Sequence, residues 1–378
     1  MIKKKIIVSV TTDLYSDQRV HKTCLSLSRF GYDVLVVGRY LGKNILSKQN
    51  EQKQRPYDVK RFHLFFNKGF LFYMTYNIRL FFFLFFNKFD ILLSNDLDTL
   101  LPNYIISKIK RKSLVYDSHE LFTEVPELKN RNFIKSFWLF IEGIVFPKLN
   151  HIITVSNSIS DYYNKKYKKK LIVIRNVPNI KSDYKSLNKN YLDNIMQKIN
   201  CVNGYKIIYQ GSLNKDRGIE LMIDCMSYVE ATLFIVGDGD VKKDLEKMVI
   251  LKKMTQNVIF LGRVPFFYLN KITSKMDLGL SFEEDACLAY KFALPNKIFD
   301  YIHAEIAVLV SDLPEMKALV NKYNVGQVLK SRAPKLASQQ ISNILENKSN
   351  YIDSVVKAKT KLCWENEEKK LIRIFKNF

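Results

Sequence analysis

The sequence has few of the residues that interrupt secondary structure or cross-link a chain. Its 378 residues include 13 glycines, 9 prolines, 5 cysteines and 2 tryptophans. So little glycine and proline excludes a collagen-like or low-complexity chain, and a hydrophobic content of 47% excludes a largely disordered one. The length exceeds that of a usual compact domain, so we expect two domains.

The cysteines are odd in number and widely spaced. No two of them form a Cys-x-x-Cys pair; they are Cys24, Cys201, Cys225, Cys287 and Cys363. This spacing excludes a disulfide framework and a zinc ribbon. It fits a protein that works in a reducing cytoplasm.

Acidic residues are scarce in the first half of the chain. Residues 1–180 hold 30 Lys and Arg against 14 Asp and Glu, whereas residues 181–378 hold 30 against 23. A basic first half favours an acidic partner, such as anionic lipid or a lipid-phosphate acceptor, and the alternative is a solvated lysine-rich surface. We find no groove-reading motif or basic–aromatic platform, so we do not expect nucleic acid binding.

One long apolar run stands out at residues 70–86, FLFYMTYNIRLFFFLFF. Its length is at the lower limit for crossing a bilayer, and Asn77 and Arg79 stand in its middle. We therefore expect a buried helix, with a helix lying on a membrane surface as the alternative.

Short β-branched runs alternate with amphipathic segments in both halves. The runs are at 6–10, 32–38, 90–95, 113–118 and 151–156, and then at 205–211, 231–239, 257–262, 277–282 and 307–312. This alternation predicts βαβ units and parallel, doubly wound α/β sheets. Ligands bind such sheets at the carboxyl ends of the strands, so we expect two Rossmann-like domains facing a cleft.

Two segments of the second half carry candidate chemistry. In the first, YQGSLNKDRGI (209–219), a buried strand ends at Gly211 and a helix begins near Gly218, so backbone N–H groups and Arg217 could cradle a diphosphate. In the second, LPNKIFDY (294–301), Asn296 is expected to cap a helix. Lys297 and Asp300, one turn apart, could then serve a phosphate and a ribose diol. The alternatives are an ordinary strand–turn–helix junction and a plain capping motif with an exposed ion pair.

Two Asp-x-Asp strings, at 96–98 and 238–240, could be mistaken for metal ligands. Gly237 and Gly239 are expected to leave room for a nucleotide or a tight turn.

Several segments in a fixed order resemble the retaining glycosyltransferases of family 4, which have the GT-B fold. In the second half these are NVIFLGRV (257–264), DLGLSF (277–282), LPNKIFDY (294–301) and VLVSDLPEM (308–316). In the first half they are DQRVHK (17–22), SLSRFGYDVLVVGR (26–39), SNDLDTLLP (94–102), VYDSHELFTEVPE (115–127) and VIRNVPN (173–179). The resemblance therefore covers nearly the whole chain.

The resemblance implies a donor site with departures from the family pattern. The family holds the diphosphate with an arginine and a lysine, whose positions here are Ser212 and Arg217, and Lys297 is a replacement for the missing charge. Asp300 takes the place of the ribose-binding glutamate, and Phe292 falls at the other glutamate position. Glu284, in the acidic run 283–285, is a substitute for that glutamate. Backbone near Arg263 is expected to contact the base.

The resemblance also implies an acceptor side in the first half. The family places a histidine facing the cleft at the position of His119, and an imidazole with an ordinary pKa suits proton handling or binding of an acceptor phosphate. Asp17 and Asp96 complete the expected acceptor site. The family neutralises the leaving diphosphate with side chains and a helix dipole, so the resemblance implies no metal or other cofactor.

We therefore expect a transferase that moves a hexose-type sugar from a nucleotide-diphosphate donor to a saccharide or lipid-linked acceptor, with retention. The expected domains are 1–180, on the acceptor side, and 205–355, which binds the nucleotide sugar, with a linker at 181–204. A helix at 356–378 is expected to pack back on the first domain. Bacterial surface-polysaccharide assembly, a cytoplasmic location and peripheral contact of Lys165 to Lys170 with an anionic inner leaflet are expected as well. The alternatives are a catalytically degenerate nucleotide-sugar-binding subunit and a sugar-nucleotide epimerase on the same fold.

Overall fold

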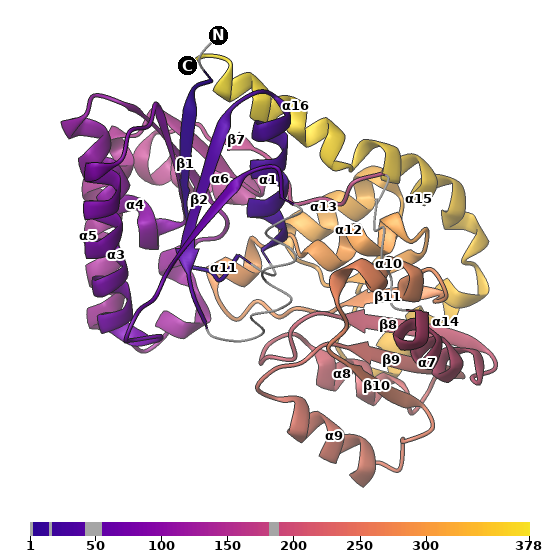
Figure 1. Cartoon of the computed structure of the whole chain (residues 1–378). Coiled ribbons are helices and arrows are strands. Elements are labelled where there is room, and N and C mark those ends of the chain that lie inside the picture. The colour runs from indigo at the N-terminus through magenta and orange to yellow at the C-terminus, as the bar shows by residue number, and fades with distance from the viewer. Residues whose placement is uncertain (1–2, 15–16, 42–54, 181–188) are drawn as a thin grey trace. The chain divides into compact units, whose positions relative to one another are not determined.

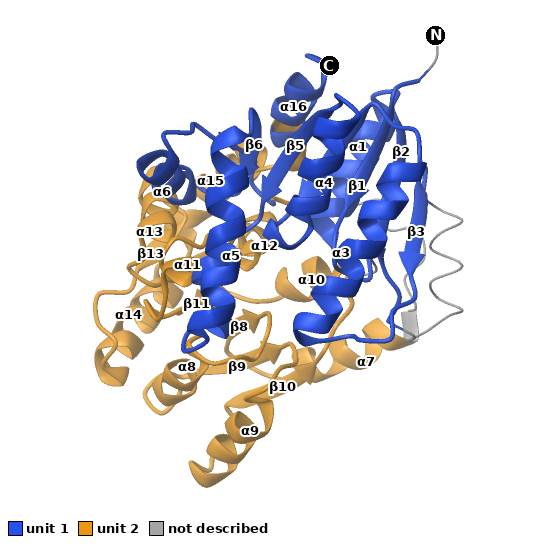
Figure 2. Cartoon of the chain, turned by 90° about the vertical axis from the view of Figure 1, so that its left-hand side faces the viewer, with its two compact units in different colours: residues 1–176, 367–378 blue, residues 177–366 orange. Residues whose placement is uncertain are grey.

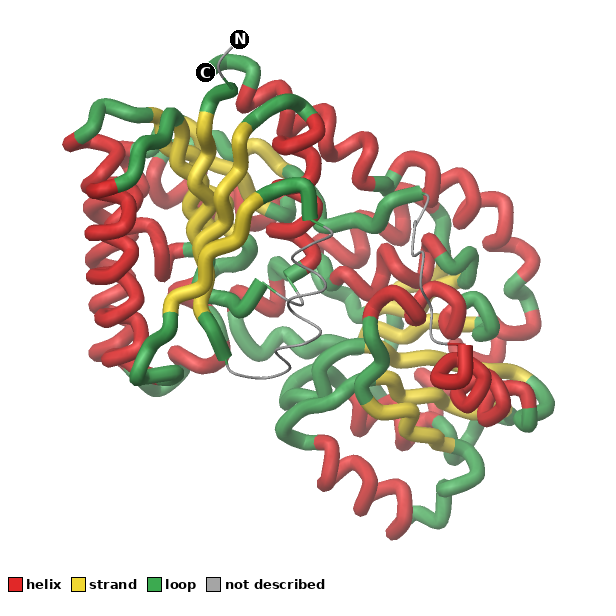
Figure 3. Tube along the Cα trace, in the orientation of Figure 1, coloured by secondary structure: helices red, strands yellow, loops and turns green. Residues whose placement is uncertain are grey.

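The computed structural model describes the chain except residues 1–2, 15–16, 42–54 and 181–188. It divides into two compact units (Figure 2). Unit 1 is Met1–Asn176 with Glu367–Phe378, and unit 2 is Val177–Asn366. Each unit contains one sheet covered by helices, as Figure 3 shows.

The sheet of unit 1 has seven parallel strands in the order β3-β2-β1-β4-β5-β6-β7. The strands are β1 (Lys5–Ser9), β2 (Asp33–Arg39), β3 (Asp58–Phe62), β4 (Ile91–Asn95), β5 (Ser113–Ser118), β6 (His151–Thr154) and β7 (Ile172–Val173). The central strands are buried on both faces, as their β-branched composition requires.

Helices lie on both faces of this sheet (Figure 1). They are α1 (Gln18–Arg29), α3 (Gly69–Phe86), α4 (Leu97–Ile109), α5 (Asn132–Val145), α6 (Asn157–Tyr167) and α16 (Trp364–Phe375). Three short 3₁₀ turns are at Phe122–Glu124, Pro126–Leu128 and Phe146–Lys148. Helices α3, α4 and α5 lie together on one face, and α1 and α16 on the other.

The sheet of unit 2 has six parallel strands in the order β10-β9-β8-β11-β12-β13. They are β8 (Tyr205–Gln210), β9 (Ala231–Val236), β10 (Val258–Gly262), β11 (Leu278–Ser281), β12 (Ala307–Val310) and β13 (Gly326–Val328). The order reverses beside β8 in this sheet and beside β1 in the other, which is the topology of a doubly wound fold. The predicted fold class is therefore confirmed.

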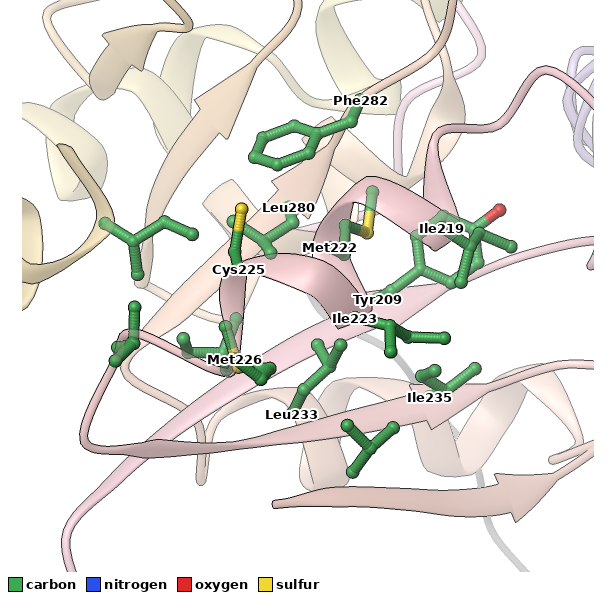
Figure 4. Packing of buried hydrophobic residues seen from close by; sticks show 14 of the residues in the cluster. Tyr209, Ile219, Met222, Ile223, Cys225, Met226, Leu233, Ile235, Leu280 and Phe282 are labelled. Atoms are coloured by element: carbon green, nitrogen blue, oxygen red, sulfur yellow. The ribbon is translucent and has the colours of Figure 1, made fainter. Parts of the chain in front are cut away.

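The helices of unit 2 complete its core. They are α7 (Lys189–Asn200), α8 (Ile219–Cys225), α9 (Lys242–Leu251), α10 (Phe266–Thr273), α11 (Leu288–Lys291), α12 (Asn296–His303), α13 (Pro314–Tyr323), α14 (Pro334–Glu346) and α15 (Ser349–Lys361). Figure 4 shows the side chains of α8, among them Met222 and Ile223, packed over Leu233 and Ile235 of the sheet. The expected linker at 181–204 lies partly outside the described residues, and its described part forms α7.

The apolar run at 70–86 forms most of α3, but our expectation that this helix is buried was wrong. Only one stripe of α3 is buried: Phe72, Tyr76, Leu80 and Leu84. The rest of its surface is largely exposed, and 22% of the helix is buried. A helix that is apolar all round gives no sign in its sequence of which sides the fold will cover.

Candidate functional site

The first group of candidate residues lies where β1, β4 and β5 of unit 1 end. Asp117 is the penultimate residue of β5, and its carboxylate is buried. Arg19 on α1 donates two hydrogen bonds to this carboxylate. Arg19 Nε lies 3.0 Å from Asp117 Oδ2, and Arg19 Nη2 lies 2.7 Å from Asp117 Oδ1. This bidentate pair fixes the loop that continues to His119.

His119 is held between two carboxylates. Its backbone N–H donates to Asp96 Oδ1 at 2.8 Å, and its ring Nδ1 lies 3.2 Å from Asp96 Oδ2. On its other side, ring Nε2 lies 3.4 Å from Asp117 Oδ2. Burial opposes the charged imidazole, but Asp96 and Asp117 outweigh it and hold the pKa of His119 well above its usual range. The expectation of an ordinary imidazole was therefore wrong, and His119 is a cation near neutral pH.

Asp96 reaches His119 from a strained backbone. Its φ is +57° and its ψ is 169°, at the residue before α4. This conformation costs a non-glycine residue free energy, so the surrounding contacts must stabilise it. The result is a partly exposed carboxylate, locked by His119 at the carboxyl edge of the sheet.

Asp98 is a different kind of carboxyl. It is buried, and Thr11 Oγ1 donates to Asp98 Oδ2 at 2.6 Å. Burial and the charge of Asp96 raise the pKa of Asp98 to about 7. The Asp-x-Asp string thus places its two carboxylates in unlike surroundings.

Both carboxylate oxygens of Asp17 accept hydrogen bonds that stabilise the local fold. Its Oδ1 accepts from Val20 N at 3.1 Å, which caps α1, and its Oδ2 accepts from Thr12 Oγ1 at 3.1 Å. Its carboxylate therefore ties the start of α1 to the loop after β1.

The second group of candidate residues lies in unit 2, where β8 and β9 end. Gly211 and Gly237 have φ values of +139° and +153°. A Cβ on Gly237 would lie 1.8 Å from the carbonyl oxygen of Gly211, and a Cβ on Gly211 would lie 3.3 Å from Lys297 Cε. The two strand ends can therefore approach each other, and Lys297, only without side chains at these positions.

Gly218 is the residue before α8, and it has a φ of +69°. A Cβ there would lie 2.1 Å from the carbonyl oxygen of Phe282. Only a glycine at this position therefore lets the loop between β8 and α8 pack against the backbone that follows β11.

Two cations converge on one buried glutamate at this edge. Lys297 Nζ lies 2.6 Å from Glu283 Oε1, and Arg217 Nη1 lies 3.9 Å from the same oxygen. Ser281 Oγ donates to the other carboxylate oxygen at 2.6 Å. Although burial raises the pKa of Glu283, Lys297 and these hydrogen bonds hold it below its usual range.

Each of the two cations lies over the ring of a tyrosine. Lys297 Nζ lies 4.1 Å from the centre of the Tyr209 ring, and the Arg217 guanidinium lies 4.3 Å from that of Tyr290. Arg217 Nε is buried and has no hydrogen-bond partner among the described residues. The guanidinium therefore retains an unused donor.

Asp300 does not pair with Lys297. Its Oδ2 accepts from Gln210 Nε2 at 2.8 Å, and Gln210 Oε1 accepts from Thr273 Oγ1 at 2.8 Å. This chain fixes the carboxylate of Asp300 against the end of β8.

Two other expectations change in the structure. Asn296 does not cap α12: Pro295 occupies the capping position, its carbonyl accepts from Ile298 N, and no side chain caps this end. Glu284 pairs with Arg332 at 2.9 Å, so Glu283 is the acidic residue beside Lys297. Glu283 and Glu284 both border a pocket of about 450 Å³ at the ends of β11, β12 and β13.

Ser212 and Arg263 lie at the ends of β8 and β10 and are exposed. The carbonyl of Ser212 accepts from Tyr209 OH at 2.8 Å. The carbonyl of Arg263 accepts from Tyr191 OH at 3.4 Å.

Sequence reasoning missed Arg19 and Gln210 as site residues, and it chose Glu284 rather than Glu283 from the acidic run 283–285. Strand alternation could have found Glu283, because Gly279, Ser281 and Glu283 share one side of β11 and its extension. A Cβ on Gly279 would lie 2.3 Å from the ring of Tyr301, so α12 covers that side of the sheet. Arg19 stands in the DQRVHK segment, but nothing in the sequence links it to Asp117.

Two family models match the chain, one in each half. Residues 17–180 match the Glycosyltransferase Family 4 model, and residues 204–347 match the model of Glycosyl transferases group 1. No curated protein matches the sequence.

Solved structures with this fold cover almost the whole chain. Sucrose-phosphate synthase from Thermosynechococcus elongatus has a TM-score of 0.78 at 13% identity, with 99% of each chain covered. Anabaena HepE in complex with UDP and glucose has a TM-score of 0.75 at 15% identity, covering 99% of this chain and 100% of its own. WaaG, a glycosyltransferase involved in lipopolysaccharide biosynthesis, has a TM-score of 0.71 at 13% identity, covering 97% and 98%. At such identities the similarity establishes the GT-B fold.

Proposed function

Because this chain is a glycosyltransferase of the family 4 and GT-B type, we propose that it moves a hexose-type sugar from a nucleotide-diphosphate donor to a saccharide or lipid-linked saccharide, with retention. The observation that carries the donor side is the convergence of Arg217 and Lys297 on Glu283 beside the glycine-lined ends of β8 and β9.

The two cations have a direct role in this reaction. As the glycosidic bond breaks, negative charge builds on the leaving diphosphate, and preorganised cations in a partly buried site stabilise it. Lys297 replaces the charge that Ser212 lacks, and Arg217 brings its unused Nε donor. Because these side chains supply the positive charge, we propose that the reaction proceeds without a metal ion.

Glu283 keeps this site in order before the donor binds. A buried lysine without a counter-charge would lose its proton or its position. The pairing at 2.6 Å holds the Lys297 side chain in place beside Gly211. We assign Asp300, whose carboxylate accepts a hydrogen bond from Gln210, to the ribose diol.

On the acceptor side, Asp96 is the group we assign to the acceptor hydroxyl. Its carboxylate is partly exposed and oriented by the cationic His119. His119 thus acts as a positioning residue and, as a cation, also favours an acceptor phosphate. Asp17 supports this edge by capping α1.

The similarity to a complex of HepE with UDP and glucose makes uridine donors the first to test. The similarity to WaaG favours assembly of a bacterial surface polysaccharide. The dispersed cysteines fit a cytoplasmic location, which the cytoplasmic supply of nucleotide sugars also requires.

A degenerate binding subunit is the second candidate, because Ser212 and Phe292 replace charged residues of the family pattern. It would bind a nucleotide sugar without turnover. A sugar-nucleotide epimerase would instead convert the donor without any acceptor.

The first experiment is thermal stabilisation of the full chain by UDP-, GDP- and ADP-sugars, with Mg²⁺ or with EDTA. A ligand at 100 times its dissociation constant adds about 2.7 kcal/mol of stability. We expect one nucleotide to raise the Tm in EDTA, and that donor to lose its sugar only when an acceptor saccharide is added. A Tm shift without transfer to any acceptor would favour the degenerate subunit. No shift with any donor would overturn the donor site.

A further inference from the structure

Helix α3 exposes an unusual amount of apolar surface. In the described part of the chain it is the one helix long and apolar enough to cross a membrane, with a mean hydropathy of 1.4. Its exposed large side chains are Phe70, Leu71, Met74, Ile78, Phe82, Phe85 and Phe86. Monomeric proteins rarely leave such a continuous patch uncovered.

Helices α4 and α5 extend this surface on the same face of the sheet (Figure 2). The rings of Phe70 and Phe137 are 6.2 Å apart, and those of Tyr73 and Trp138 are 5.4 Å apart, so α3 and α5 are in contact. The exposed large apolar residues of the two helices are Leu101, Ile105, Ile109, Phe133, Ile134, Phe137, Phe140 and Ile144. We call the exposed residues of α3, α4 and α5 the three-helix face.

The charges on the three-helix face have one sign. The three helices contain two acidic residues, Asp98 and Glu142, and both are buried. Glu142 is used internally, where its Oε1 accepts from Lys166 Nζ at 2.7 Å. The exposed charged residues on these helices are Lys108 and Arg79, whose guanidinium is held against the domain, so no exposed acidic residue of the three helices opposes an anionic surface.

A basic pocket lies at one end of the three-helix face. It has a volume of about 260 Å³ and is formed where α4 and the turn after α5 lead into β5 and β6. Its basic lining residues are Lys108, Arg111, Lys112, Lys148 and His151. Lys112 also pairs with Asp90 at 2.9 Å, whereas Lys108, Arg111 and Lys148 make no ion pair among the described residues. Such a pocket fits a phosphate group.

Helix α3 cannot leave the domain to span a bilayer. Its buried stripe is part of the core, and Tyr76 OH donates to the carbonyl of Val10 at 2.7 Å. Arg79 Nη1 donates to the carbonyl of His63 at 2.6 Å, which folds its charge back onto the domain. The helix can therefore contact lipid only along its outer side, lying in the plane of the interface.

We propose that the three-helix face rests on an anionic phospholipid bilayer, with the basic pocket holding a lipid phosphate. Apolar side chains enter the headgroup–acyl boundary, and the cations bind the phosphates around them. A second copy of the chain is a poorer occupant, because two surfaces without exposed acids would bring like charges together.

The position of the face suits a lipid-borne acceptor, and this step rests on the proposed function. The loop from β3 to α3 carries Phe65, which is fully exposed, and Phe66. This loop leaves the carboxyl edge of the parallel sheet, the same edge that holds Asp96 and His119. A membrane-bound face would thus place the acceptor site close to the lipid surface.

The test is co-sedimentation of the full chain with vesicles of phosphatidylcholine alone or with 30% phosphatidylglycerol, at low and high salt. The face variant is Phe82→Ser/Phe86→Ser/Phe133→Ser/Phe140→Ser, whose residues are 52%, 77%, 87% and 66% exposed. The matched control is Ile250→Ser/Leu251→Ser on α9, whose residues are 64% and 83% exposed. We expect binding to the anionic vesicles, weakened by salt, reduced about tenfold or more in the face variant and unchanged in the control.

A second variant, Lys108→Gln/Arg111→Gln, tests the pocket, with the exposed Lys247→Gln as its control. We expect weaker binding to anionic vesicles and no change in Tm. Equal binding of the face variant and the wild-type chain would overturn the proposal, as would equal binding to neutral and anionic vesicles. Loss of a dimer in the face variant, without vesicle binding by the wild type, would assign the face to self-association instead. Donor-induced thermal shifts, measured in parallel without lipid, report on the proposed function separately.

Discussion

The ammonium of Lys297 lies 2.6 Å from the carboxylate of Glu283, and both groups are buried. Separated charges in such surroundings cost several kcal/mol each, so neither residue can be changed alone without consequence. The same pair that holds unit 2 together at this point faces the proposed diphosphate site, and double variants can separate the two roles.

Lys297→Met should destabilise the protein by about 3–5 kcal/mol, because it leaves Glu283 buried without its nearest counter-charge. Lys297→Met/Glu283→Gln should recover most of this loss, since glutamine can still accept the hydrogen bond from Ser281. Urea denaturation measures both effects. Neither variant should show the Tm shift with a nucleotide sugar.

A double variant that binds the donor as the wild type does would remove Lys297 from the diphosphate site. Low pH gives an independent check on the pair. The pKa of Glu283 is lowered in the folded chain, so its contribution to stability is present above its ordinary pKa and is lost as the pH falls through the folded value.

Gly237→Ala should prevent the ends of β8 and β9 from approaching, because its Cβ would lie 1.8 Å from the carbonyl oxygen of Gly211. We expect a large fall in Tm and loss of donor binding. Gly143→Ala is the control: it lies on a helix with no neighbouring atom within 4 Å, and it should stabilise the protein by about 0.5–1 kcal/mol. A Gly237→Ala protein with wild-type Tm and affinity would show that this close approach is dispensable.

Asp98→Asn should change how stability depends on pH. The pKa of Asp98 rises from 3.8 to about 7 on folding, so the folded chain binds this proton more tightly than the unfolded chain. Stability from this group is therefore present below pH 4 and is lost as the pH rises toward 7. Asparagine keeps an acceptor for Thr11 without the charge, so the variant should be more stable than the wild type at pH 8, with a Tm several degrees higher.

The exposed Asp244→Asn serves as its control and should leave the profile unchanged. If Asp98→Asn lowered the Tm at pH 8, the charged carboxylate of Asp98 would stabilise the folded chain, which would contradict the raised pKa.

Asp300→Ala should weaken donor binding about ten- to a hundredfold, because charge-assisted hydrogen bonds to a diol contribute about 1.5–3 kcal/mol. Gln210→Leu should weaken it about tenfold by releasing Asp300. Titration calorimetry with the nucleotide sugar measures both. Gln327→Leu is the control: this partly buried glutamine accepts from Gln340 in a different network, so its replacement should not affect donor affinity. An Asp300→Ala protein with unchanged affinity would exclude the ribose contact.

The strands of both sheets could be predicted because each is a short β-branched run bounded by polar residues. The strands that were missed, β3, β7 and β13, are short or partly exposed, such as Asp58–Phe62 with its alternating charges. The outward face of α3 could not be predicted, since phenylalanine occurs on every side of it.

The residues alone predicted the candidate site where neighbours in sequence remain neighbours in space, and the family resemblance added Lys297, which lies beside Gly211. Gly211, Arg217 and Gly218 lie in one loop and were identified together. The charge state of His119 depends on Asp96 and Asp117, which two different strands bring to it. The choice of Glu283 over Glu284 depends on which side of β11 each side chain takes.

Helix α16 has a consequence for synthesis of the chain. From Glu367 on, this helix and the residues after it belong to unit 1, where Tyr32 OH donates to the carbonyl of Phe375 at 2.7 Å and Glu367 Oε2 accepts from Arg175 N at 3.2 Å. In the chain these residues follow the whole of unit 2, so the ribosome makes them after it. Unit 1 therefore remains incomplete, with the face of its sheet that carries α1 only partly covered, until the segment that forms unit 2 has been synthesised and α16 has left the exit tunnel.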